Sequence, residues 1–170
     1  MKSRNRNTKY MKFTILSTVL FLTMTTSFAQ SAFDKMTNEK MSKVLLREAT
    51  EVEGKLGNWQ VLYQETLLLV ITDENYNRMR IITPVQEVAK LKEGELKILL
   101  ESNFDKALDS KYAIFDDLVW STFTHPLNEL TVEQFKDAMK QVVMLSKTFG
   151  TTYTSTDFVF GTANQSDDGN

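Results

Sequence analysis

His125 is the only histidine in the chain, which contains no cysteine. Nucleophilic catalysis by histidine needs a serine or cysteine partner and an orienting acid, and nothing in the sequence indicates that such groups converge on His125. A zinc site needs several histidine or cysteine ligands, which this sequence does not supply. Since Pro126 follows directly, we interpret His125 as a residue at a strand end, and we expect no metal ion and no cofactor.

One acidic segment offers oxygen ligands at the spacing that opens a calcium-binding loop. Asp73, Asn75 and Asn77 occupy alternate positions. Arg78 then stands where the loop requires glycine, and Pro84 stands where it requires a bidentate glutamate. Because Asn and Asp also stabilise turns through local side-chain hydrogen bonds, we predict a hairpin turn here and no metal site.

Asp116 and Asp117 are adjacent carboxylates, and a carboxylate pair can serve acid/base catalysis. Such catalysis needs a carboxyl group whose pKa is displaced toward neutrality, whereas adjacent acids on a turn point into water. We therefore interpret this pair as a tight turn. Glycine-rich phosphate loops and nucleophile elbows are absent from the sequence. The sequence indicates a protein without enzymatic activity, with a carboxylate-dependent hydrolase as one alternative.

Four aromatic residues fall on predicted strands: Trp59, Tyr63, Trp120 and Phe123. Aromatic side chains of strands are commonly buried beneath helices, so the first interpretation assigns them to the core. A sheet with helices on one side has a second face, however, and large apolar residues there would mark a surface for a partner or a second copy. These four residues are the candidate partner-binding residues.

The hydrophobic pattern predicts the elements that position these residues. Apolar residues recur at spacings of three and four in helices and alternate in strands. The predicted helices are 38–49, 95–108 and 132–149, and the predicted strands are 58–64, 67–71, 78–83, 111–115 and 118–124. Short turns between consecutive strands imply antiparallel pairing. The expected fold is α+β, an antiparallel five-stranded sheet with three helices in the order α-β-β-β-α-β-β-α.

Two of the predicted strands carry further information. Residues 67–71 are continuously apolar, which predicts a central strand covered on both faces. Pro84 cannot donate to a β-ladder, so the strand before it should end there or lie at a sheet edge.

The last predicted helix has the strongest local signature. Thr131 and Gln134 have the spacing of a capping box, and Leu130 and Phe135 have the spacing of a hydrophobic staple. Gly150 supplies a stop signal after the last turn.

The charge of the chain is unevenly distributed. The chain has 170 residues, with 20 basic and 22 acidic side chains. Five of the bases and none of the acids lie in the first 29 residues, so 15 bases face 22 acids in the other 141, a net charge of −7. Because nucleic-acid affinity depends on Lys and Arg, this acidic part argues against nucleic-acid binding.

The first segment, residues 1–29, has the three regions of a secretory signal peptide. A basic stretch precedes an apolar run at residues 13–24, and small residues then favour cleavage before Gln30. The run is shorter than a membrane span of about 20 residues, so we expect no stable anchor after cleavage; an uncleaved anchor is the alternative. We expect export to the periplasm or the cell exterior. Met1 and Met11 are both possible starts, since a complete signal follows either.

The division of the chain follows from these patterns. Residues 1–29 are the predicted signal peptide, residues 30–154 a single α+β domain, and residues 155–170 a mobile polar tail. A domain of this size can bury a core without disulfides or metals.

Several short motifs resemble a known family. They are Leu99-Leu100-Glu101-Ser102-Asn103, Lys111-Tyr112-Ala113-Ile114, Pro126-Leu127 and Leu130-Thr131. With the order of elements, they make the chain from about residue 35 to residue 154 similar to the YbjN-like bacterial proteins, which share the fold of type III secretion chaperones. The resemblance implies a small, often dimeric, protein-binding module without catalytic residues. Asn103, which matches the family pattern, is interpreted as a helix-end or buried structural amide.

The leading hypothesis combines these observations. We expect an exported, non-enzymatic, protein-binding or chaperone-like module that acts through a sheet face or edge, with a protein partner or a second copy as its ligand. The alternatives are an envelope protein that binds a small ligand or glycan, and the hydrolase named above.

Overall fold

The computed structural model describes residues 35–158 of the chain. The predicted signal peptide, residues 1–29, and most of the predicted polar tail lie outside this range. No helix among the described residues has the length and apolar character needed to cross a membrane.

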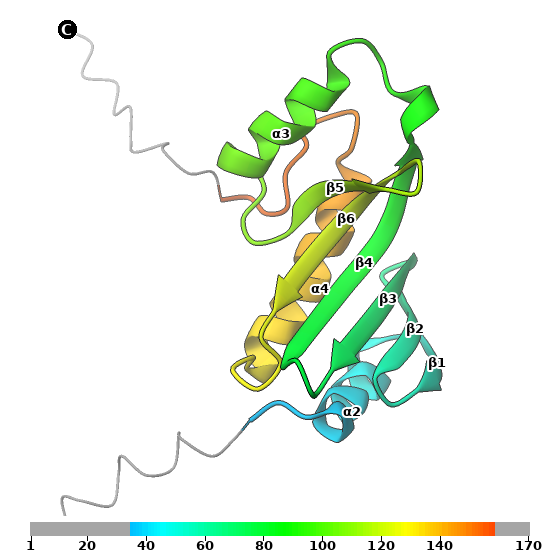
Figure 1. Cartoon of the computed structure of the whole chain (residues 1–170), viewed down its shortest axis with the longest axis vertical. Helices are drawn as coiled ribbons and strands as arrows, with labels where there is room; N and C mark the ends of the chain where they lie inside the picture. The colour runs from blue at the N-terminus through cyan, green and yellow to red at the C-terminus, as the bar shows by residue number, and fades with distance from the viewer. Residues whose placement is uncertain (1–34, 159–170) are drawn as a thin grey trace, which may run out of the picture. The chain divides into compact units, whose positions relative to one another are not determined.

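One antiparallel sheet forms the centre of the described part (Figure 1). Its six strands are β1 (Glu51–Lys55), β2 (Asn58–Tyr63), β3 (Thr66–Asp73), β4 (Arg78–Glu87), β5 (Lys111–Phe115) and β6 (Leu118–His125). Their order across the sheet is β1-β2-β3-β4-β6-β5, and every neighbouring pair is antiparallel. Consequently β1 and β5 are the two edges of the sheet.

The sheet has one strand more than the sequence predicted. β1 pairs with β2 along its whole length, yet four of its five side chains are exposed and Val52 alone is partly buried. An exposed edge strand carries no hydrophobic alternation, which is why the pattern missed it. Gly54 has φ of 108°, and a Cβ there would come within 2.3 Å of the Asn58 carbonyl oxygen. Glycine is therefore required inside this strand.

β4 also differs from its prediction, because it continues through Pro84 to Glu87. The ladder between β3 and β4 runs only as far as the pair Leu69 and Ile82, and a register shift between Pro84 and Gln86 marks a bulge opposite β6. Pro84 thus lies where β4 has lost its partner on one side, a position that tolerates a missing N–H donor.

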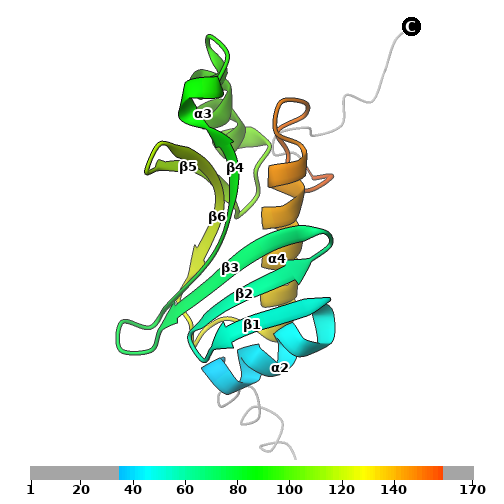
Figure 2. The ribbon, with the colours of Figure 1, turned by 90° about the vertical axis from the view of Figure 1, so that its right-hand side faces the viewer.

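The helices α2 (Asn38–Glu48) and α4 (Val132–Lys147) cover one face of the sheet (Figure 2). The main core lies between them and the inward side chains of the strands, and its largest fully buried members include Met41, Leu45, Leu68, Met79, Ile81, Phe135 and Met139. The predicted capping box is confirmed: the Thr131 hydroxyl accepts from Gln134 N at 3.1 Å, and Thr131 N donates to Gln134 Oε1 at 2.9 Å.

The helix α3 (Glu95–Asp105) packs beside β5 and does not join this layer (Figure 1). Its buried residue Leu99 belongs to a second, smaller core cluster with Ala107, Tyr112, Val119, Leu145 and Tyr153. The helix is shorter than the predicted 95–108, because Lys106 caps it with its N–H bonded to the Ser102 carbonyl.

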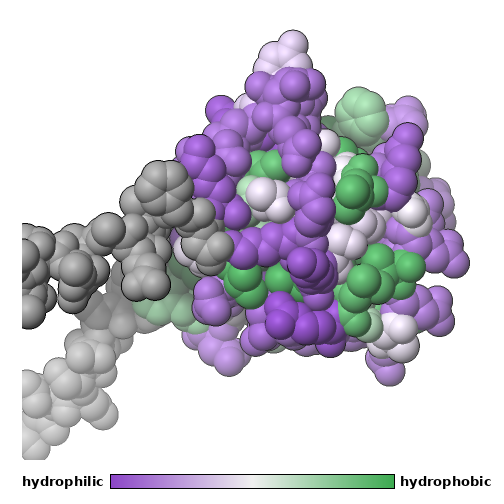
Figure 3. Space-filling model, turned by 90° about the horizontal axis from the view of Figure 1, so that it is seen from below, coloured by the Kyte–Doolittle hydropathy of each residue, from purple (hydrophilic) through white to green (hydrophobic). Residues whose placement is uncertain are grey.

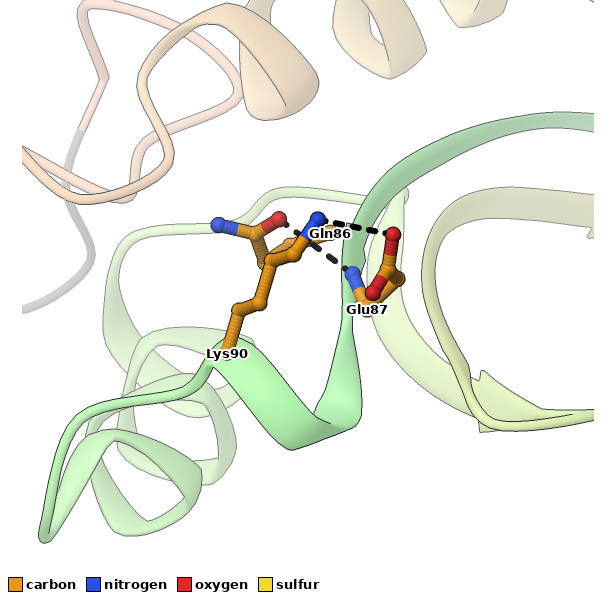
Figure 4. A network of polar contacts seen from close by, with 3 residues as sticks. All are labelled: Gln86, Glu87 and Lys90. Carbon is orange, nitrogen blue, oxygen red and sulfur yellow. Dashed lines mark hydrogen bonds and ion pairs between the residues drawn. The ribbon is translucent and has the colours of Figure 1, made fainter.

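A short 3-10 helix, η1 (Val88–Lys90), connects β4 to α3. Lys90 Nζ lies 2.8 Å from Glu87 Oε1, and Glu87 N donates to Gln86 Oε1 at 3.3 Å (Figure 4). Both charged side chains are more than half exposed, so this ion pair adds little stability.

The segment after α4 returns to α3 and fixes it. Tyr153 Oη donates to Glu95 Oε1 at 2.7 Å, and Ser155 Oγ accepts from Leu108 N at 2.7 Å. Ser155, the first residue of the predicted tail, is buried. The packed part of the chain therefore extends past residue 154.

Candidate functional site

The four candidate aromatic residues lie on opposite sides of the sheet. Trp59, Tyr63 and Phe123 face α2 and α4 and are only 3%, 6% and 6% exposed. Trp120 is half-buried and points to the other side, because it lies one residue out of phase with the buried Val119 and Ser121. Three of the four are core residues that a partner cannot reach in the folded chain, and Trp120 alone stays a candidate.

The side of the sheet opposite α2 and α4 carries a set of apolar side chains that no helix of the described residues covers. In Figure 1, α4 lies behind β4 and β6. We call this side the uncovered face; its apolar residues are Leu62, Leu67, Leu69, Ile71, Ile82, Pro84, Ala113, Phe115, Leu118 and Trp120. Leu67 is 50% exposed, Ile71 39% and Phe115 74%.

This finding corrects one prediction. β3 is central in the sheet, as expected, but it is covered on one face only. Leu68 and Val70 are fully buried, whereas Leu67 and Ile71 are exposed. A continuous apolar strand normally indicates helices on both sides, and here the second layer is missing.

Cross-strand pairing makes the apolar residues of the uncovered face continuous. Leu62 pairs with Leu67 between β2 and β3, and Leu69 pairs with Ile82 between β3 and β4. Trp120 of β6 pairs with Pro84 on one side and with Ala113 of β5 on the other. Directly opposed side chains lie about 5 Å apart, and neighbours on the same face of one strand lie about 7 Å apart, so these residues form a connected apolar path across five strands. The polar Gln60, opposite Leu69, and Thr122, opposite Ile82, lie beside this path.

Trp120 is held in place on this face. Its indole Nε1 donates to the Phe115 carbonyl at 3.0 Å. The single polar atom of the ring is therefore satisfied within the β5–β6 hairpin, which leaves the ring itself as apolar contact surface.

Two arginines border the apolar residues at one end of the uncovered face. Arg78 and Arg80 of β4 are exposed, and Arg80 is paired with Ile71 of β3 and with Thr124 of β6. Arg80 Nε donates to Thr124 Oγ1 at 3.2 Å, and Arg78 Nη1 donates to the Asn77 carbonyl at 2.8 Å. No ion pair between described residues involves either guanidinium.

A second apolar surface lies between α3 and the outer edge of β5. It is a groove of about 310 Å³ lined by Leu96, Leu99, Leu100, Asn103, Tyr112, Ala113 and Ile114. Leu100 is 70% exposed, and Phe104, on the next turn of α3, is 87% exposed. We call this surface the α3–β5 groove.

Asn103 closes part of the β5 edge inside this groove. Its side-chain amide accepts from Tyr112 N at 2.7 Å and donates to the Tyr112 carbonyl at 3.0 Å, as a neighbouring strand would. The prediction of a structural amide is confirmed. Because outward backbone groups alternate along an edge strand, Ile114 is the next residue whose N–H and carbonyl face outward.

Lys111 supports the same corner by capping α3. Its Nζ donates to the carbonyls of Asn103, Ala107 and Leu108 at 2.6, 3.1 and 3.0 Å. Burial lowers the pKa of this ammonium group, and the nearby Asp109 opposes that shift. A cation on the last carbonyls of a helix is favourable.

The polar candidates of the sequence serve turns and strand ends. Asp73 Oδ1 accepts from Asn75 N and Tyr76 N at 3.0 and 3.1 Å, which is the predicted turn. Asp116 and Asp117 have φ of 52° and 56°, the left-handed values of a two-residue hairpin turn. Among the described residues, no group of three or more His, Cys, Asp or Glu side chains could hold a metal ion.

His125 ends β6, as predicted, and lines a polar pocket of about 250 Å³ with Asp109, Phe123, Thr124, Gln134, Asp137 and Gln141. The imidazole stacks on Phe123 at 6.0 Å, and its Nδ1 lies 2.8 Å from the Pro126 carbonyl. The buried Gln141 amide donates to Asp137 and Asp109 and accepts from Asp109 N and Ser110 N. The polar groups of this pocket thus join α4 to the segment before β5.

The carboxyl groups with displaced pKa values are spread over the fold. Backbone N–H donors are the largest cause of the lowered pKa of Glu39 in α2 and Glu95 in α3, and the Asn77 side-chain amide is the largest cause of the lowered pKa of Glu129 before α4. The backbone N–H of Lys92 is the largest cause at Glu95, followed by the Tyr153 hydroxyl. These groups are stabilised as anions, which suits structural acceptors.

Comparisons with known proteins identify the fold. No profile of a known family matches the sequence, and no curated protein matches it. A chain of the HopA1–SchA chaperone–effector complex matches with a TM-score of 0.50 and 13% identity, over 65% of this chain and 92% of that one. A chain of the ExsC–ExsE complex matches with a TM-score of 0.50 and 14% identity, over 65% and 90%. A chain of the complex of the Yersinia pestis type III secretion chaperone SycH with a stable fragment of YscM2 matches with a TM-score of 0.47 and 17% identity, over 63% of this chain and 97% of that one.

The likenesses at a TM-score of 0.50 show that this chain shares the fold of the matched chains of the HopA1–SchA chaperone–effector complex and the ExsC–ExsE complex. Membership of the YbjN-like family stays a prediction.

Proposed function

We propose that this chain is a non-enzymatic, chaperone-like module that holds polypeptide segments of a partner protein on the uncovered face of its sheet. The observation that carries the proposal is the connected apolar surface across β2, β3, β4, β6 and β5. It includes β3, whose continuously apolar sequence is typical of a strand buried on both faces. Solvated apolar areas of this kind mark interaction sites. The fold shared with a chain of a chaperone–effector complex supports the same function.

The chemistry of the uncovered face suits a non-folded polypeptide. Leu67, Ile71 and Phe115 are 50%, 39% and 74% exposed in the free chain. Covering apolar surface contributes about 25 cal/mol per Å², from which the entropic cost of binding is subtracted. The α3–β5 groove and the His125 pocket have volumes of only about 310 and 250 Å³. The uncovered face is broader and offers a partner more apolar contact area.

Aggregation of a chemically denatured reporter enzyme tests the proposal. We expect the chain comprising residues 30–170 to suppress light scattering of the diluted reporter, and the double variant Leu67→Asp with Ile71→Asp to lose most of that effect. Leu46→Asp is the matched control, because Leu46 is 67% exposed on α2, away from the uncovered face. Equal suppression by all three proteins would exclude this face as the binding surface.

A photo-reactive amino acid at position 67 provides a second readout. Cross-links to the denatured reporter should form at position 67 and not at position 46. Circular dichroism of each variant shows that the fold is kept.

A second copy of the chain is the partner that we assign to the α3–β5 groove. The exposed Leu100 and Phe104 and the outward backbone groups of Ile114 supply an apolar stripe beside an open strand edge. Sedimentation velocity should give a dimer whose dissociation constant rises at least tenfold in Leu100→Glu and is unchanged in Leu46→Glu. A monomer at all concentrations would contradict this assignment.

Export is the remaining part of the proposal, and it rests on residues 1–29 of the sequence. Mass spectrometry of the protein expressed from Met1 in a bacterial host should find Gln30 as the first residue. A chain that keeps residues 11–29 would contradict cleavage, and one recovered only from the cytoplasm would contradict export.

A further inference from the structure

We propose that Arg80, assisted by Arg78, makes the uncovered face select extended segments in which a carboxylate lies at one end of a series of apolar residues at every second position. This inference rests on the proposed function and names the class of polypeptide that the surface takes.

The charge on the face is the first step. The two residues directly opposite Arg80, Ile71 and Thr124, are neutral. Only its Nε is used, by Thr124, so both terminal nitrogens of the guanidinium have no partner among the described residues. A planar fork of free N–H groups beside an apolar surface is the geometry that binds a carboxylate through two hydrogen bonds.

Arg78 contributes less. It pairs across the strands with Asp73, whose negative charge offsets part of its own, and one of its nitrogens is bonded to Asn77. Asp73 itself is committed to the turn, where its Oδ1 accepts from Asn75 N and Tyr76 N, and no ion pair with Arg78 forms. Arg80 is thus the principal anion-binding residue of the face.

The spacing along β4 defines the spacing of the ligand's residues. Arg80, Ile82 and Pro84 point to the uncovered face at every second position, so their Cα atoms are about 7 Å apart. Ile82 is flanked by Leu69, and Pro84 by Trp120. An extended segment has the same period of two residues, so a carboxylate at Arg80 places the next two side chains of the same side over these apolar pairs.

The positions of Arg80, Ile82 and Pro84 along β4 explain why this ligand fits better than a cationic or uniformly apolar one. A lysine at the first position would meet the Arg80 guanidinium, and an alanine or leucine there would leave it without a partner. A carboxylate paired with an exposed guanidinium gains about twofold to fivefold in affinity over a neutral residue.

Fluorescence anisotropy with three labelled peptides tests the inference. The peptides share the core X-Ser-Leu-Ser-Leu-Ser, in which X is Glu, Gln or Lys. We expect the Glu peptide to bind the wild-type chain about twofold to fivefold more tightly than the Gln peptide at low salt, and the Lys peptide to bind most weakly. The preference should shrink at 0.5 M salt, because part of it is an exposed charge interaction.

Two variants and a control assign the effect to Arg80. Arg80→Gln should reduce the ratio of Glu to Gln affinities to about one, and Arg80→Glu should reverse the order in favour of the Lys peptide. Arg47→Gln, on α2, is the matched control and should keep the wild-type ratio. Arg80 is exposed, so these substitutions leave the core intact.

The outcomes separate this inference from the proposed function. Equal binding of all three peptides to the wild-type chain, abolished by Leu67→Asp with Ile71→Asp, would overturn the selection by Arg80 while supporting the surface itself. A preference that survives Arg80→Gln would also overturn it. If no peptide binds and the double aspartate variant still suppresses reporter aggregation, the proposed function itself fails.

Discussion

The two sides of β3 have nearly the same amino-acid composition and opposite surroundings. Leu68 and Val70 are fully buried under α2 and α4, whereas Leu67 and Ile71 remain half or more than a third exposed on the other side. The hydrophobicity of a strand therefore indicates which side chains favour burial. It does not indicate whether a second layer of secondary structure is present to bury them. The apolar pattern of this strand is satisfied on one side by the fold itself and on the other side only by a ligand.

The reason for the difference lies in where the third helix goes. α2 and α4 pack on the same side, and α3 lies at the β5 edge, held there by Tyr153 and Glu95 from one direction and by Asn103 from another. Two helices cover one face, and no described element is left for the second.

The surface seen from below is mainly hydrophilic with separate apolar areas (Figure 3). The uncovered face differs from it in the continuity of its apolar residues.

The sharpest test of the comparison substitutes neighbouring leucines of β3. Leu68→Ala should lower the free energy of unfolding by about 2–5 kcal/mol, because it leaves a cavity in the core. Leu67→Ala removes the same atoms from a half-exposed position and should cost less than about 1 kcal/mol. Urea denaturation monitored by circular dichroism measures both. Equal losses would mean that the second side of β3 is covered after all.

Removing the hydrogen bond from Tyr153 to Glu95, which holds α3 in place, should give the next largest loss of stability. Tyr153→Phe removes a hydrogen bond to a buried carboxylate and should cost about 1.5–3 kcal/mol at pH 7. Tyr76→Phe, at a 76% exposed position, is the matched control and should change stability little.

The stability that the Tyr153–Glu95 hydrogen bond contributes should also depend on pH. The Lys92 N–H and the Tyr153 hydroxyl lower the pKa of Glu95 below its ordinary 4.5. Its ionised form therefore contributes stability that is fully present above pH 4.5 and is lost as the pH falls through the lower, folded-state value. Urea titrations from pH 7 to pH 3 should show the deficit of Tyr153→Phe shrinking over that range. A deficit independent of pH would contradict an ionised Glu95 as the acceptor.

Adjacent polar residues of β6 repeat the comparison on a smaller scale. The Ser121 hydroxyl, on the covered side, donates to the Val142 carbonyl of α4 at 2.9 Å and is fully buried. Ser121→Ala should cost about 1 kcal/mol, the typical worth of one such bond. Thr122→Val, on the uncovered face, should change stability by less than about 0.5 kcal/mol. Thermal unfolding compares the two, and a larger loss at Thr122 would indicate a contact on that face.

The sequence predicted the fold where local chemistry decides it. The capping box at Thr131, the turn at Asp116 and Asp117 and the structural amide of Asn103 depend on nearby groups, and each was confirmed. The order of the helices and of five strands followed from apolar periodicity. β1 was missed because an exposed edge strand has no such periodicity, and its glycine has the φ of a bend.

The candidate surface was predicted less well, for a different physical reason. Strand alternation placed Trp59, Val61 and Tyr63 on one side of β2, but which side the helices occupy depends on contacts distant in the sequence. The selection of four aromatics therefore combined three core residues with one surface residue. The apolar residues of β3 on the uncovered face were predicted to be buried, since a continuously apolar strand has the same pattern whether or not a second layer covers it.

The two tryptophans offer the gentlest test, because each reports one side of the sheet. Trp59 is 3% exposed beneath the helices, and Trp120 lies on the uncovered face. In the variant Trp59→Phe, the emission of Trp120 should be quenched by acrylamide several-fold more strongly than the emission of Trp59 in Trp120→Phe. Adding the Glu peptide described above should protect Trp120 from the quencher and leave the quenching of Trp59 unchanged. Protection of Trp59 alone would place the ligand on the helix side and reverse the comparison of the two faces.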